Sequence, residues 1–240
     1  MLEQRTHERP MVASKIDINE IRIKLDQLGD HLISLLKHRS RHPRNLGVFT
    51  QEFAGGKTWF LYRLQKEQDI DSEFGRYLYP DQHPLIFNKS ELTPARIVRA
   101  IPVVEGLVGV SLDISKKLIP VYQELLEQIC IGGEDETSYG QTAKLDVEIL
   151  LTLNERIIGL GEQVAQYKVE QNPDIVISKD KVAIKSQLVV PEREKQVIEQ
   201  SIAAAQKYAI KNPLAIGDFM KRVIAITVDV EVDYILSRIS

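Results

Sequence analysis

Thr227 and Glu231, near the C-terminus, have side-chain types and a spacing that suggest chemistry. They lie four residues apart, so on a helix both side chains are on one face, and this face is otherwise apolar and rich in valine. A carboxyl group in apolar surroundings has a raised pKa, because burial disfavours its charged form. Kept neutral, Glu231 can donate a hydrogen bond to an oxygen that gains negative charge. The structural alternative is an interface ion pair, for example with Arg238.

Two arginines lie on or beside apolar stripes of predicted helices. Arg22 stands between Ile21 and Leu25, where it is either a surface side chain that reaches water or a cation held to bind a carboxylate. Arg156 follows Ile149 by seven residues, so it projects along the apolar face of its helix. A charge there needs a carboxylate, either from the protein in a buried ion pair or from a ligand.

Lys168 and Glu194 give weaker signals. Lys168 comes twelve residues after Arg156, and a regular helix would turn it roughly 100° away from the face of that arginine. A one-residue bulge near Gly159-Leu160-Gly161 would bring the two side chains back to one face. Glu194 follows Pro191 in the first turn of a predicted helix, where the helix dipole stabilises a carboxylate, and this local role is the default interpretation.

Helices must position these residues, and the sequence pattern predicts them. Apolar periodicity and helix-start signals favour helices at residues 16–40, 57–72, 142–170 and 191–211. Residues 213–239 alternate like a strand over part of their length, but the length of the segment favours a helix.

The remaining segments are less regular. Residues 96–130 are expected to be helical in pieces, with Pro102 and Pro120 at or near the breaks, and Ile175-Val176-Ile177 fits a short strand. We expect a flexible tail over residues 1–14 and one domain over residues 15–240.

Composition limits the classes of function. The chain has 240 residues and a net charge of −3, so it lacks the basic field that gathers nucleic acid or an anionic membrane. No apolar run reaches the length of a membrane span. A single cysteine, Cys130, rules out an intramolecular disulfide and predicts a reducing, cytoplasmic location. The five histidines lack metal-ligand spacing with Cys130, and we expect no metal. The run Gly55-Gly56-Lys57-Thr58 is not a phosphate-binding loop, because Gln51 replaces its first glycine.

Three segments resemble the eukaryotic-type, all-helical chorismate mutases of the AroQ class. They are residues 18–28, with an arginine between isoleucine and a leucine-rich stripe; residues 146–157, with an arginine ten residues after an aspartate; and residues 226–238, with the threonine and glutamate described above. The resemblance extends from about residue 14 to the end. It implies an all-α, homodimeric isomerase that rearranges chorismate to prephenate in phenylalanine and tyrosine biosynthesis, without a cofactor.

The same resemblance implies an active site built from Arg22, Arg156, Lys168, Glu194, Thr227 and Glu231. The two arginines would clamp the two carboxylates of chorismate, with help from the threonine. The lysine and a protonated Glu231 would donate hydrogen bonds to the ether oxygen, and Glu194 would accept one from the ring hydroxyl.

This chain departs from the family pattern at several positions. Tyr167 stands where the family has its lysine, eleven residues after the arginine, and Val190 replaces an active-site asparagine. In regulated members, aromatic amino acids bind at the dimer interface. Here the matching positions are Arg76, Gly140 and Gln141, which keep one arginine of two and replace a serine, so we predict weak or absent feedback. Two alternatives stay open: a chorismate-using enzyme of specialised metabolism, and a helical interaction protein without catalysis.

Overall fold

The computed structural model describes residues 15–97, 106–110, 112–176 and 180–238. The expected tail of residues 1–14 and the expected break at Pro102 lie outside the described residues. Helices account for 72% of the described residues, which confirms a predominantly helical fold. Within the described ranges, no helix is both long enough and apolar enough to cross a membrane.

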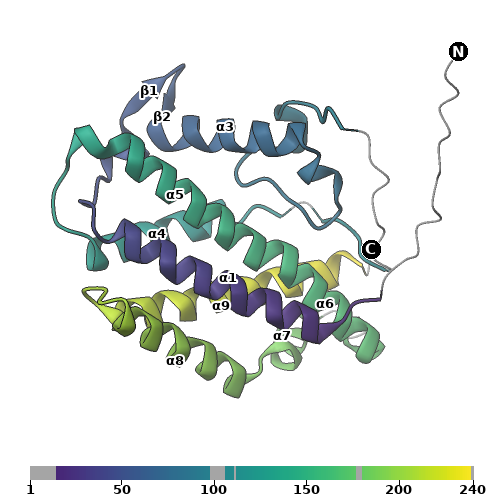
Figure 1. Cartoon of the computed structure of the whole chain (residues 1–240). Coiled ribbons are helices and arrows are strands. Elements are labelled where there is room, and N and C mark those ends of the chain that lie inside the picture. Colours follow the sequence, from purple (N-terminus) through teal and green to yellow (C-terminus); the bar gives the residue numbers. More distant parts are fainter. Residues whose placement is uncertain (1–14, 98–105, 111, 177–179, 239–240) are drawn as a thin grey trace, which may run out of the picture.

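The described helices and strands follow one another along the chain as in Figure 1. The α-helices are α1 (Ile18–Arg39), α2 (Gly47–Thr50), α3 (Trp59–Glu73), α4 (Ser115–Ile129), α5 (Tyr139–Asn154), α6 (Leu160–Gln171), α7 (Lys181–Leu188), α8 (Pro191–Lys207) and α9 (Pro213–Ser237). A π-helix, Glu155–Gly159, joins α5 to α6. Short 3₁₀ helices occupy Arg76–Leu78, Lys89–Glu91, Glu136–Ser138 and Pro173–Val176, and the strands are β1 (Glu52–Ala54) and β2 (Lys57–Thr58).

The helices that carry the candidate residues begin at sequence signals. The Asp17 side chain caps α1 by accepting a hydrogen bond from the backbone N–H of Asn19. Proline opens both α8 and α9, where its missing N–H is not needed and its fixed φ suits the first turn. The Asn212 side chain also accepts from the N–H of Ala215 at the start of α9. These signals set where the pocket-facing turns of each helix begin.

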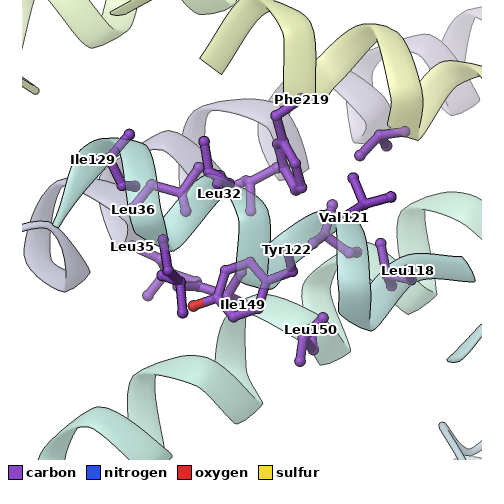
Figure 2. Packing of buried hydrophobic residues seen from close by; sticks show 14 of the residues in the cluster. Leu32, Leu35, Leu36, Leu118, Val121, Tyr122, Ile129, Ile149, Leu150 and Phe219 are labelled. Carbon is purple, nitrogen blue, oxygen red and sulfur yellow. The ribbon is translucent and has the colours of Figure 1, made fainter. Parts of the chain in front are cut away.

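The long helix α9 packs against α4, α6, α7 and α8, and α1 packs against α5, α6 and α8. Figure 1 shows α1 and α5 side by side. The main hydrophobic core lies between α1, α4, α5 and α9. Figure 2 shows how leucine, isoleucine and aromatic side chains from these helices interlock, among them Leu32, Leu118, Tyr122, Ile149 and Phe219. Burial of this apolar surface is the main term that holds the helices together.

Three local expectations need correction. Pro120 lies inside α4 and does not break it. The described part of the expected strand, Ile175 and Val176, is in a 3₁₀ helix. The all-α prediction also missed the small hairpin β1–β2, whose turn holds Gly55 and Gly56 at positive φ, a conformation that costs glycine little.

Candidate active site

One pocket collects all six residues that the sequence pointed to. It has a volume of about 180 Å³ and lies between α1, α6, α8 and α9, with the π-helix and the end of α7 at its border. The lining residues from α1 include Arg22, those from the π-helix and α6 include Arg156 and Lys168, those from α8 include Glu194, and those from α9 include Thr227 and Glu231. The structure therefore brings together residues that are up to 209 positions apart (231 − 22).

The π-helix Glu155–Gly159 solves the spacing problem of Lys168. A π-helical turn takes up one extra residue, so the twelve positions from Arg156 to Lys168 span what eleven would span on a regular helix. Both side chains line the pocket. The predicted bulge is confirmed, and it lies slightly earlier in the chain than Gly159-Leu160-Gly161.

Arg156 is buried, with 8% of its surface exposed, and one Nη donates a hydrogen bond to the carbonyl oxygen of Leu25. Among the described residues, no carboxylate lies within 4.0 Å of its guanidinium nitrogens. Burial lowers the pKa of Arg156 to about 10, and Arg193 adds to the lowering, while Asp26 opposes it. A buried cation is normally paired, so this geometry favours the ligand interpretation of Arg156 over the structural ion pair.

Lys168 and Glu231 are in contact across the pocket. The Lys168 Nζ lies 3.0 Å from the Glu231 Oε2 and 2.7 Å from the carbonyl oxygen of Leu188. Burial raises the pKa of Glu231 above its ordinary value, and nearby Glu194 adds to this, whereas Lys168 lowers it. The alternative partner, Arg238, instead binds Gln166 and the carbonyl oxygen of Gly106, so it does not pair with Glu231.

Thr227, Arg22 and Glu194 also line the pocket. The Thr227 hydroxyl donates to the Val223 carbonyl oxygen at 3.0 Å, one turn earlier on α9. Arg22 is exposed on α1, and among the described residues its guanidinium has no ion-pair or hydrogen-bond partner, which leaves it available to a ligand. Glu194 is half-buried in the first turn of α8.

Two residues that the sequence did not point to, Arg193 and Leu188, also line the pocket, together with Val190, which the sequence had placed there. Arg193 adds a fourth cation to the lining and is held by Asp26 of α1, with Nη2 2.7 Å from Oδ1. Val190 and Leu188 add apolar surface beside it. Arg193 gave no distinguishing signal, because it stands among several charged residues at the start of α8.

The positions matched to a regulatory site lie apart from one another within the chain. Arg76 binds Asp71 and Glu155, at the C-terminal end of α5. Gly140 and Gln141 are exposed at the N-terminal end of the same helix. Fifteen residues of helix separate Gly140 from Glu155, or about 22 Å. One small molecule therefore cannot touch both regions in a single chain.

The chemistry of the pocket is that of an anion site. Arginine, lysine, threonine and carboxyl side chains face one small volume, and they can orient an anion and donate hydrogen bonds to it. Across the described residues, no group of three or more histidine, cysteine, aspartate or glutamate side chains is arranged to hold a metal ion.

Comparisons with known proteins support the resemblance seen in the sequence. The family described as chorismate mutase type II matches residues 138–232. The chorismate mutase of Schizosaccharomyces pombe is 25% identical, over 95% of this chain and 99% of its own. Chorismate mutase 2 of Petunia hybrida is 27% identical, over 94% of each chain.

The fold has solved counterparts. The chorismate mutase of Candida albicans, crystallised with L-Trp, superposes with a TM-score of 0.83 at 23% identity, over 93% of this chain and 92% of that one. These relatives support neither alternative, the chorismate enzyme of specialised metabolism or the helical protein without catalysis. The predicted resemblance is confirmed: over nearly its whole length, this chain is similar in sequence to chorismate mutases of yeasts and plants, and its fold is similar to that of a solved yeast chorismate mutase.

Proposed function

We propose that this protein is a chorismate mutase, an isomerase that rearranges chorismate to prephenate. The observation that carries the proposal is Arg156, a buried guanidinium without a carboxylate partner among the described residues, which faces a pocket with Arg22 and Lys168. Chorismate is a dianion, and the two arginines match its two carboxylates.

The reaction needs no nucleophile and no cofactor. One carbon–oxygen bond of the ether breaks and one carbon–carbon bond forms within the same molecule, so no proton or electron is exchanged. The protein has to hold a flexible substrate in its compact conformer and stabilise the negative charge that grows on the ether oxygen.

We assign the roles by position in the pocket. Arg22 and Arg156 bind the two carboxylates, and Thr227 assists them. Their places on α1, the π-helix and α9 support a clamp from different sides of one volume. Binding from several rigid helices fixes the substrate with little residual motion, which is how a site lowers the entropic part of a barrier.

Lys168 and Glu231 are assigned to the ether oxygen. Their 3.0 Å contact places both donors at one point, and the raised pKa of Glu231 supports a protonated carboxyl that donates a hydrogen bond. Glu194 then accepts a hydrogen bond from the ring hydroxyl. At position 190 the valine side chain offers no polar contact, so we expect substrate binding to be weaker than with asparagine there.

We further propose a cytosolic homodimer with weak or absent feedback by tyrosine or tryptophan. Ile70, Phe74 and Leu78 are exposed within nine residues of sequence at and after the end of α3, and exposed apolar surface of this kind supports an interface. Cys130 is buried and free, as suits a reducing compartment. Arg76 already binds Asp71, Gln82 and Glu155, so an effector would have to displace these contacts.

The first experiment measures the loss of chorismate absorbance on adding the purified protein and identifies the product. Conversion to prephenate is the expected result. A folded protein, verified by its helical circular dichroism, that leaves chorismate unchanged would contradict the proposed function. The oligomeric state follows from light scattering during gel filtration, and a chorismate saturation curve that shifts clearly with tyrosine or tryptophan would contradict the weak feedback.

A further inference from the structure

The π-helix that aligns Arg156 with Lys168 requires support from outside, because π-helical turns are rare and short inside α-helices. Unfavourable local backbone geometry persists only where the surrounding structure over-determines it. The connection that follows α3 contacts the π-helix and the turns on either side of it. We call residues 76–83 the clamp segment.

The clamp segment contacts the N-terminal side of the π-helix twice. The Asn154 Nδ2 donates to the carbonyl oxygen of His83 at 2.7 Å. The Arg76 Nη2 lies 2.9 Å from the Oε2 of Glu155, the first residue of the π-helix. Asn154 is buried, so its hydrogen bond is protected from competing water.

The clamp segment also contacts the C-terminal side. The His83 Nε2 lies 3.0 Å from the Glu162 Oε2, and these side chains are only 8% and 0% exposed. The Gln163 Nε2 donates to the Asp81 Oδ2 at 2.6 Å. Between the two sides, Gly159 approaches so closely that an added Cβ would lie 2.9 Å from the carbonyl oxygen of Asp81.

These contacts fall on one face of the helix and the pocket on another. The clamp segment touches residues 154, 155, 159, 162 and 163. The residues that face the pocket from the same stretch are 156, 160, 161, 164 and 168. No residue belongs to both sets, so the clamp segment can act on the substrate only by setting the position of the helix.

We propose that the clamp segment holds the π-helix in place, and that His83 and Glu162 are positioning residues for Arg156 and Lys168. This role in turnover rests on the proposed function, whereas the effect on the π-helix does not. Glu162 is fully buried, and removal of its histidine partner would leave a buried carboxyl without that contact. Because a buried carboxyl without this contact is unfavourable, the local backbone would rearrange, and Lys168 would turn away from Glu231.

The kinetic test compares His83→Ala with His83→Gln. A displacement of about 1 Å at reacting groups lowers turnover by as much as 100-fold, so we expect kcat of His83→Ala to fall by about 10-fold or more, with KM changed by less than about threefold. The glutamine amide can still donate to Glu162, so His83→Gln should keep most of the activity. His31→Ala is the matched control. His31 also faces a glutamate, but its side chain is half-exposed and its contact with Glu148 is long, at 3.8 Å. Wild-type kcat and KM in folded His83→Ala would overturn the proposal.

Deletion of Gly159 should restore the activity that His83→Ala loses. Without Gly159, Lys168 comes eleven residues after Arg156, and on a regular helix eleven residues bring the two side chains to within about 20° of one face. Such a helix needs no π-turn and no clamp segment. We therefore expect the chain lacking Gly159 to be active and to stay active when His83→Ala is added. A folded double variant that is as impaired as His83→Ala alone would overturn the proposal.

A crystal structure of His83→Ala tests the clamp segment without any turnover. The expected result is a rearranged π-helix and a Lys168 Nζ that no longer lies near Glu231. An intact π-helix with the 3.0 Å contact retained would overturn the inference, even if the enzyme proves active on chorismate. Failure of the wild-type protein to convert chorismate would contradict only the proposed function, and this structure would still decide on the clamp segment.

Discussion

The chain buries two arginines in opposite ways. Arg39 is fully buried and binds the Asp146 carboxylate at 2.6 Å, the carbonyl oxygens of Pro43 and Arg44, and the thiol of Cys130. Arg156 is nearly as buried, yet it is bound only by a backbone carbonyl. Burial opposes both charges, but Asp146 raises the pKa of Arg39 above its ordinary value, whereas the pKa of Arg156 falls to about 10.

The difference separates a structural cation from a binding cation. Around Arg39 the protein supplies every partner, so the charge is part of the folded core. Around Arg156 the described residues leave the charge without a carboxylate, so the folded protein carries an electrostatic cost that a bound anion removes. The number of partners, rather than the depth of burial, distinguishes the two roles.

The largest expected effect is on stability at the Arg39 site. Asp146→Ala leaves a buried guanidinium without its carboxylate and removes the acceptor of the Tyr122 hydroxyl. Breaking a buried pair in this way costs about 3–5 kcal/mol. Urea denaturation measures it, and a loss below about 1 kcal/mol would remove the distinction between the two arginines.

Arg156→Met should have the reverse pattern. The variant keeps the fold and its free energy of unfolding does not decrease, because it removes a buried charge that lacks an ion-pair partner. Its kcat/KM for chorismate should fall by about 100-fold or more, since truncating one partner of a buried charge pair costs about 2–5 kcal/mol. Arg222→Met is the control, because Arg222 pairs with Glu124 at an exposed position. An unfolded Arg156→Met would mean that both arginines are structural.

The pH dependence tests the donor beside Lys168. Because burial raises the pKa of Glu231, the protonated form extends to higher pH than for a free glutamate. Activity that depends on this form is present below the raised pKa and is lost as pH rises through it. Glu231→Gln keeps a donor at all pH values, so its profile should lack this fall. A wild-type profile without the fall, or a glutamine variant with the same fall, contradicts the protonated carboxyl.

The smallest expected effect is at the pocket wall. Val190→Asn adds one polar side chain beside Glu194, and one hydrogen bond contributes about 0.5–1.5 kcal/mol. We expect KM for chorismate to decrease by roughly 2- to 10-fold with the fold unchanged. Chorismate saturation curves of the wild type and of Val190→Asn measure the two KM values. An equal or higher KM in the variant would show that the asparagine is not needed here.

Helices were predictable because their periodicity is local. Residues 18–39 and 213–237 were expected within a few positions, and the spacing of Arg156 and Lys168 predicted the bulge. The partner of Arg39 was not predictable, since Asp146 lies 107 positions away. Arg193 was missed for the same reason, because its contact with Asp26 joins two helices distant in sequence. Likewise, the lack of a partner at Arg156 depends on every neighbour in space.

Cys130 gives the Arg39 site a practical consequence. Burial raises the pKa of its thiol to about 11, and the side chain lies 3% exposed beside the guanidinium. Thiolate is the reactive form, so an alkylating reagent should attack the folded protein very slowly. Since this is the sole cysteine of the chain, the rate of labelling reports how often the core opens. A mass measurement over time can therefore follow the breathing of the native protein, with no engineered probe.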